Sequence, residues 1–123
     1  MRTAIWVGVG GFFGSMARYG VAGVVSRVNE AFAWGTFVVN VTGSFAAGLL
    51  IAALGHRLAL HPDLRIAVTV GFIGAYTTFS TFTLETFEFA ETGSGQLAIV
   101  NVVASVAVGV IAVWAGTLLG RNI

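Results

Sequence analysis

The chain has 123 residues, of which 57% are hydrophobic and 9% are charged. A water-soluble domain carries roughly a quarter charged residues, so these proportions exclude a soluble globular protein and indicate a lipid environment. The formal net charge of +1 excludes the clustered basic surface that nucleic-acid binding requires.

Four continuous apolar stretches occupy most of the chain. Each has about 20 residues, the length that an α-helix needs to cross the hydrocarbon core of a bilayer. Because the stretches do not alternate in polarity, they do not fit the strands of a membrane β-barrel. We therefore expect a single domain, residues 1–123, that is an all-α membrane protein of four transmembrane helices. The predicted spans are residues 4–25, 34–54, 66–87 and 97–119.

The first span combines glycines with an arginine near its end, Arg18. Gly10 and Gly14 form a pair of small residues one turn apart, which lets helix backbones approach closely in lipid. Arg2 and the following apolar residues also resemble a cleavable signal peptide. The apolar sequence continues past the small residues of such a cleavage site, so we expect this helix to be retained.

The second span carries polar groups at helical spacing. Asn40 lies one turn after Thr36, and its amide supplies two donors and one acceptor. Such an amide either bonds neighbouring helices, for about 1 kcal/mol, or binds a transported ion. The same span presents a packing face of small residues, namely Gly43, Ser44, Ala47 and Gly48.

The third span has the highest density of hydroxyl groups. Residues 71–83 (GFIGAYTTFSTFT) hold five hydroxyl residues, a tyrosine and three phenylalanines, more than packing requires. Glycines and β-branched threonines weaken a helix, so this composition predicts an interruption near the middle of the span that frees carbonyl oxygens. A cation or a partner chain would satisfy those carbonyls.

Two phenylalanines follow the predicted interruption at helical spacing. Phe79 and Phe82 share one face, and Ser80 and Thr83 form an adjacent row of hydroxyl groups. Ordinary core packing is the alternative for the two rings. In the fourth span, Asn101 and Ser105 lie one turn apart and provide either interhelical hydrogen bonds or a second row of donors, and Gly116 and Gly120 form another small-residue pair.

Several reactive groups are missing from the spans. The chain has no cysteine, so it has no disulfide or thiol nucleophile, and no carboxylate lies at the centre of a span. Glu85 and Glu88 fall towards the end of the third span. His56 and His61 share one loop and are expected to be solvated at the membrane surface. We therefore expect neither an enzyme nor an organic cofactor.

The arginines indicate how the chain is oriented. Arg2, Arg57, Arg65 and Arg121 would lie on one side of the membrane, and Arg18 and Arg27 on the other. Four arginines on one side against two on the other favour an orientation in the cell (inner) membrane with both termini in the cytoplasm. The difference is small enough for both orientations to insert. A four-helix bundle fills its own centre, so a polar pathway needs a second copy, and opposite orientations predict an antiparallel homodimer.

Three stretches together carry a resemblance to a known family. They are residues 10–19 (GGFFGSMARY), 34–45 (WGTFVVNVTGSF) and 71–82 (GFIGAYTTFSTF). Over essentially its whole length the chain resembles the Fluc-type (CrcB) fluoride channels. The resemblance implies a fluoride-selective passive channel that exports fluoride and lowers its cytoplasmic concentration.

The resemblance also implies roles for individual residues. It implies an antiparallel homodimer with two pores, a broken third helix and a structural Na⁺ on the two-fold axis, held by the backbone carbonyls of Gly74 and Thr77 from both subunits. Arg18 would lie in a vestibule. The implied fluoride pore residues are Asn40, Phe79, Phe82, Ser80, Thr81, Thr83, Thr36 and Ser105.

Fluoride permeation makes physical sense for this set. A small anion must exchange its water for directed donors, which amides and hydroxyls provide, and an aromatic ring edge adds positive potential. A negative membrane potential would expel fluoride with about 2.3 kcal/mol per 100 mV. A small dual-topology multidrug exporter is one alternative, but it needs a central glutamate that the first span lacks. A structural membrane subunit is the other.

Overall fold

The computed structural model describes residues 1–29, 31–56 and 60–123, and within these ranges all regular secondary structure is helical. This confirms the all-α prediction. Glu30, Arg57 and the side chain of His56 lie outside the described residues, so the expectations that involve them are not examined further. The elements are α1 (Arg2–Ser26), α2 (Trp34–His56), α3 (Pro62–Ile66), η1 (Ala67–Phe72), α4 (Ile73–Tyr76), α5 (Phe79–Glu91) and α6 (Gly95–Asn122).

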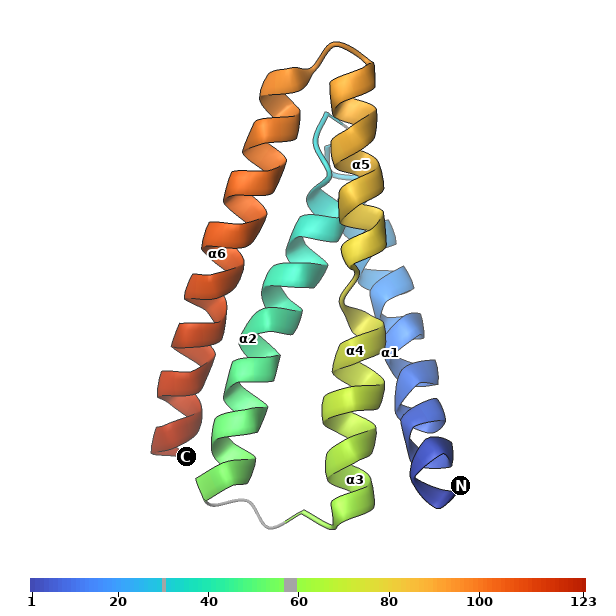
Figure 1. Ribbon diagram of the computed structural model, residues 1–123, viewed down its shortest axis with the longest axis vertical. Helices are drawn as coiled ribbons and strands as arrows, with labels where there is room; N and C mark the ends of the chain where they lie inside the picture. The colour runs from blue at the N-terminus through green and yellow to red at the C-terminus, as the bar shows by residue number, and fades with distance from the viewer. Residues whose placement is uncertain (30, 57–59) are drawn as a thin grey trace.

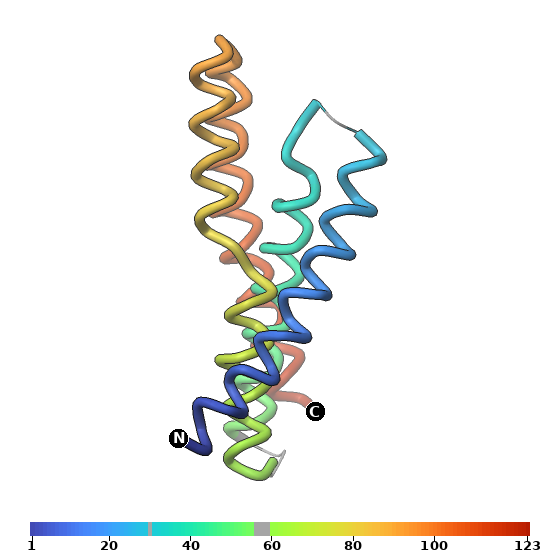
Figure 2. The backbone as a smooth tube through the Cα atoms, turned by 90° about the vertical axis from the view of Figure 1, so that its right-hand side faces the viewer, coloured from blue at the N-terminus to red at the C-terminus, as the bar shows by residue number. Residues whose placement is uncertain are grey.

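α1, α2, the stretch from α3 to α5, and α6 alternate in direction along the chain (Figure 1). Both termini and the start of α3 lie at one end of the molecule, and the turn between α5 and α6 lies at the other. α6 packs along α2, whereas α1 packs against η1 and α4. Figure 2 shows that α5 and the adjoining half of α6 diverge from α1 and α2.

Among the described residues, three helical stretches are long and apolar enough to cross a membrane. They are Trp34–Gly55, Pro62–Glu91 and Gly95–Asn122, and they contain the predicted spans 34–54, 66–87 and 97–119. α1 has 25 residues, which is sufficient length, but it is not among the three. Its many glycines and Arg18 lower its hydropathy without shortening it.

Glycines in α1 allow it to contact the backbone of the third stretch. A Cβ atom on Gly10 would overlap the carbonyl oxygen of Ala67, and one on Gly14 would overlap that of Phe72. Gly71 lies in the π-helical turn η1, and a Cβ there would be 2.6 Å from the carbonyl oxygen of Val7. The small-residue pair of the first span is therefore a packing surface, as its spacing indicates.

The second small-residue pair joins α6 to α2. A Cβ atom on Gly116 would overlap the carbonyl oxygen of Phe45, and one on Gly120 would overlap that of Leu49. Gly48 of α2 meets α6 in the same way, at the carbonyl oxygen of Val113. Backbone contact on both sides explains why these two helices form the longest packed surface in the described chain.

The third stretch is broken at Thr77 and Thr78. α4 ends at Tyr76 and α5 begins at Phe79, and the two threonines between them are extended, with φ −78° and ψ 156° for Thr77 and φ −146° and ψ 117° for Thr78. Thr78 caps α5, because its Oγ1 accepts the N–H of Thr81 at 3.3 Å. The predicted interruption is confirmed, and the β-branched pair rather than the glycines forms it.

Candidate ion pathway at the helix break

Asn40 of α2 holds the broken backbone. Its Nδ2 donates to the carbonyl oxygen of Thr78 at 3.0 Å, and its Oδ1 accepts the N–H of Thr78 at 2.8 Å. Since a primary amide has two N–H donors, one is left over. Asn40 is half-buried and lines a groove of about 330 Å³ together with Ser44, Thr77 and Phe79. The remaining donor has no hydrogen-bond partner among the described residues, and it belongs to a residue that lines this groove.

The break also frees two main-chain carbonyls. In a continuous helix the N–H of Thr78 would bond the carbonyl of Gly74, and that of Thr81 would bond the carbonyl of Thr77. Here these two N–H groups bond Asn40 Oδ1 and Thr78 Oγ1 instead. Carbonyl oxygens without a helical partner fit a hard cation, which prefers oxygen ligands. The pair that the resemblance implies for Na⁺ thus has suitable chemistry.

Arg18 lies on the wall of a second cavity, across the break. Its Nη1 is 3.5 Å from the carbonyl oxygen of Thr77. The cavity has a volume of about 560 Å³, and the residues that line it include Arg18, Thr36, Thr78 and Thr81. A guanidinium with several hydroxyl groups creates a positive, hydrogen-bonding environment that favours an anion.

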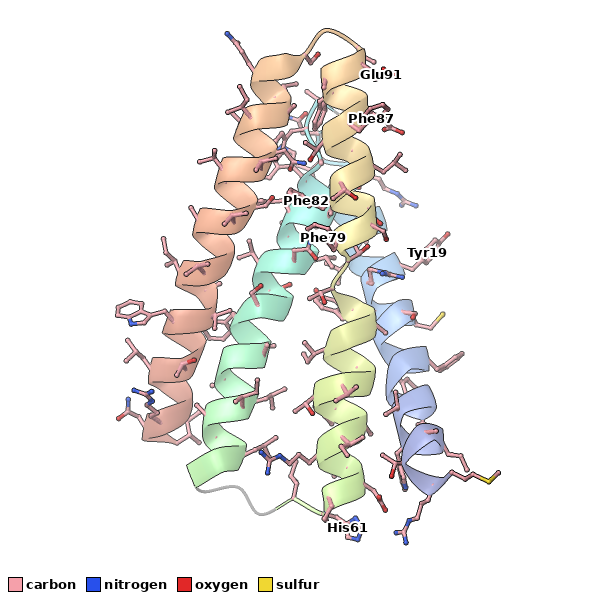
Figure 3. The ribbon with its side chains drawn as sticks, in the orientation of Figure 1. Tyr19, His61, Phe79, Phe82, Phe87 and Glu91 are labelled. Carbon is pink, nitrogen blue, oxygen red and sulfur yellow. The ribbon has the colours of Figure 1, made fainter. Side chains whose placement is uncertain are left out.

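Phe79 and Phe82 lie on neighbouring turns of α5 (Figure 3). Their ring centroids are 5.7 Å apart and the rings are tilted by 44°. Phe82 is buried, with 9% of its surface exposed, whereas Phe79 is 76% exposed in the single chain. Phe82 therefore has a packing role in addition to any role at an ion. Phe79 has no such packing role within the single chain.

The hydroxyl row of α5 is largely exposed. Ser80, Thr81 and Thr83 are all exposed, and Thr83 donates to the carbonyl oxygen of Ser80 at 3.0 Å. Thr78, which is buried, connects the row to the break, since its Oγ1 is 2.9 Å from that of Thr81 and 3.4 Å from Ser80 Oγ. Sequence reasoning counted Thr78 among the hydroxyl residues but did not assign it to the pore.

Thr36 contacts a residue that the sequence analysis did not place in the pathway. Its Oγ1 donates to Oε1 of Glu85 at 2.7 Å, while Oε2 of Glu85 is buried without a hydrogen-bond partner among the described residues. Thr36 itself is buried, with 7% of its surface exposed. The sequence feature that could have linked Glu85 to this region is its spacing. It lies four residues after Thr81, which places both residues on one face of α5.

The fourth helix contributes Asn101 to this region. Asn101 is 1% exposed, and its Nδ2 donates to Thr86 Oγ1 at 2.8 Å. Thr86 in turn donates to the carbonyl oxygen of Phe82 at 2.7 Å. Ser105 is half-buried in α6, and no hydrogen bond joins it to another described residue. The structure thus links Asn101, rather than Ser105, to the phenylalanine pair.

The fold and this site define an integral membrane protein of apolar helices, in which a broken span brings hydrogen-bond donors close to carbonyls that have no helical partner. Residues 5–117 match the family described as "CrcB-like protein, Camphor Resistance (CrcB)". The chain belongs to this family.

Curated relatives match along the full chain. A protein of Acidobacterium capsulatum is 43% identical over 120 residues, which cover 97% of this chain and 96% of the relative. One of Solibacter usitatus is 48% identical over 118 residues, covering 94% and 96%. One of Geobacter sulfurreducens is 42% identical over 124 residues, covering 100% of both. Each of these relatives is named "Fluoride-specific ion channel FluC".

Proposed function

We propose that this protein is a fluoride-selective channel that lets fluoride leave the cell passively. The observation that carries the proposal is the unused N–H of Asn40, which lines a groove beside Phe79 at a break in a membrane span. An amide donor and an aromatic edge suit a small anion. The names of the full-length relatives support the same substrate. A passive channel forms no covalent intermediate, so we assign no catalytic residue.

The channel would be an antiparallel homodimer in the cell (inner) membrane, with α1 as the fourth crossing. α1 has sufficient length and contacts η1 through backbone atoms, as a helix within the bilayer would. Phe79 and the hydroxyl row of α5 are exposed in the single chain, so a second copy would be required to enclose them. The small arginine bias permits the two orientations that such a dimer needs.

A structural Na⁺ would accompany this assembly. The carbonyls of Gly74 and Thr77 would hold it, with equivalent groups from the second copy. When bound, the ion would supply positive charge next to the anion donors and would satisfy oxygens that the break leaves free. Asn40 and Arg18 would keep the break open from the two sides, through their contacts with Thr78 and Thr77.

The test is fluoride efflux from liposomes that contain only this purified chain, with sodium present, chloride as the comparison anion and valinomycin to dissipate the potential. We expect fast efflux of fluoride and little of chloride. Efflux that requires a proton gradient would favour an exporter. No efflux from folded protein, alone or with an oppositely oriented homologue, would support the structural-subunit alternative.

A further inference from the structure

Tyr76, the last residue of α4, forms a hydrogen bond across to α2. Its hydroxyl oxygen is 2.9 Å from Oγ1 of Thr42. Thr42 already donates its own hydroxyl hydrogen to the carbonyl oxygen of Val38 at 2.7 Å. Either hydroxyl can donate in the contact between them, and the donor is Tyr76 when the single hydroxyl hydrogen of Thr42 is on Val38.

The ring of Tyr76 is held as firmly as its hydroxyl. It stacks on Phe72, with centroids 6.0 Å apart and ring planes 10° apart. On α2 it packs over Gly43, where a Cβ atom would lie 3.1 Å from Tyr76 Cδ1 and would overlap the methyl group of Thr77. Any side chain larger than hydrogen at position 43 would push Tyr76 and Thr77 away from α2.

One turn of α2 thus contacts every residue at the break. Thr42 bonds Tyr76, Gly43 accommodates Thr77, and Asn40 holds both main-chain groups of Thr78. Asn40 can hydrogen-bond to Thr78 only if the C-terminal end of α4 lies level with this turn of α2. The bond between Tyr76 and Thr42 lies on the α4 side of the break, where the helix would otherwise end without a polar anchor to α2.

We propose that Tyr76 and Thr42 are positioning residues for fluoride conduction. Their hydrogen bond holds the end of α4 in the register in which Asn40 engages Thr78 and keeps its second N–H directed into the groove. This inference rests on the proposed channel function. A hydrogen bond between membrane helices contributes about 0.6 kcal/mol, so its loss should change the equilibrium constant between the engaged and disengaged arrangements about threefold.

The test compares Tyr76→Phe, Thr42→Val, the double variant and Thr42→Ser, which keeps the hydroxyl. Thr117→Val is the matched control, because the one hydrogen bond of its hydroxyl among the described residues is to the carbonyl of Val113 in its own helix. Two quantities are measured in liposomes: the fraction of vesicles that release fluoride, which counts folded channels, and the fluoride concentration at half-maximal rate.

We expect Tyr76→Phe and Thr42→Val each to raise the half-maximal concentration, by at most about threefold, at an unchanged vesicle fraction. The double variant should be no worse than either single one, and Thr42→Ser should behave as wild type. A fall in vesicle fraction with unchanged half-maximal concentration, or an equal shift in Thr117→Val, would overturn the proposal.

Backbone exchange separates this inference from the channel proposal. If the wild-type chain conducts fluoride and Tyr76→Phe matches it in full, only the positioning role fails. If the wild-type chain conducts no fluoride, hydrogen exchange at the Thr78 amide still decides the inference. Its N–H should exchange about threefold faster in Tyr76→Phe than in wild type, and equal rates would refute the role of the tyrosine.

Discussion

Thr36 of α2 donates a 2.7 Å hydrogen bond to Oε1 of Glu85 of α5, and no described residue bonds Oε2 of the same carboxylate. The two residues are 49 positions apart in the sequence. This bond joins the start of α2 to α5, two segments that diverge in Figure 2. The carboxylate depends on one hydroxyl for its contact with the rest of the described protein.

Replacing Thr36 with valine should therefore destabilise the fold. The change keeps the shape of the side chain and leaves both oxygens of Glu85 without a described partner, which should lower the free energy of unfolding by about 1–3 kcal/mol. Unfolding in mixed detergent micelles measures this. Thr117→Val is the control, and adding Glu85→Gln should recover part of the loss because a neutral amide is less costly to bury.

The hydrogen-bonding groups of Asn40 give a second prediction. Asn40→Leu removes both bonds to Thr78 and should reduce fluoride efflux about 10–100-fold, the effect of leaving two buried main-chain groups unpaired. Asn40→Asp keeps an acceptor for the Thr78 N–H but lacks the amide donors, so it should also lose efflux. Wild-type efflux in Asn40→Asp would mean that the second N–H does not meet the ion.

The two phenylalanines should differ in their effect on stability. Phe82 is buried, so Phe82→Ala should lower the free energy of unfolding by about 3–5 kcal/mol. Phe79 is mostly exposed in the single chain, so Phe79→Ala should cost less than about 1 kcal/mol in a monomeric state. Fluoride efflux should be lower than wild type in both variants. A concentration-dependent loss of stability in Phe79→Ala would indicate that a second copy covers this ring.

The α1 packing surface predicts a contrast between neighbouring glycines. Gly10→Ala introduces a Cβ into the carbonyl oxygen of Ala67 and should destabilise the protein by about 1–3 kcal/mol. Gly8 is on the same helix with no atom within 4 Å of such a Cβ. Gly8→Ala should therefore be neutral or stabilising, since alanine favours a helix. Equal effects in the two variants would contradict close packing of α1 on η1.

Removing sodium tests the proposed ion at Gly74 and Thr77. If all sodium on both sides of the liposome membrane is replaced by N-methylglucamine, fluoride efflux should stop, and it should return when sodium is restored. The bulky organic cation cannot enter between main-chain carbonyls. Efflux that persists after prolonged dialysis would show that the freed carbonyls are satisfied in another way, such as by Arg18.

The sequence predicted the local features of the third stretch well. Glycines and consecutive threonines weaken a helix through their own conformational preferences, so the break could be located without any tertiary information. The sequence predicts the region of the break but not its position at Thr77 and Thr78. Both the glycines and the β-branched threonines of this region weaken a helix, each for a different reason. The structure shows that extended threonines with a side-chain cap form it.

Contacts between distant segments could not be predicted in the same way. Asn40 was recognised as a polar residue in a span, but its pairing with Thr78 depends on how high α4 ends against α2. That height depends on the close contact of Gly43 with the side chains of Tyr76 and Thr77, which no pattern in one segment reveals. Glu85 lies near the end of a predicted span and was not assigned to the site, although its spacing from Thr81 places the two residues on the same face of α5.

The break also has an electrical consequence for the two short helices that meet there. The helical stretch from Pro62 to Tyr76 has its carbonyl end at the break, and α5 has its N–H end there. Both ends lie within the span Pro62–Glu91. Peptide dipoles sum along each helix, so a partial negative charge and a partial positive charge of about half an elementary charge face the same region. A cation and an anion can therefore be stabilised a few residues apart by the main chain alone, without a formal charge on either helix end.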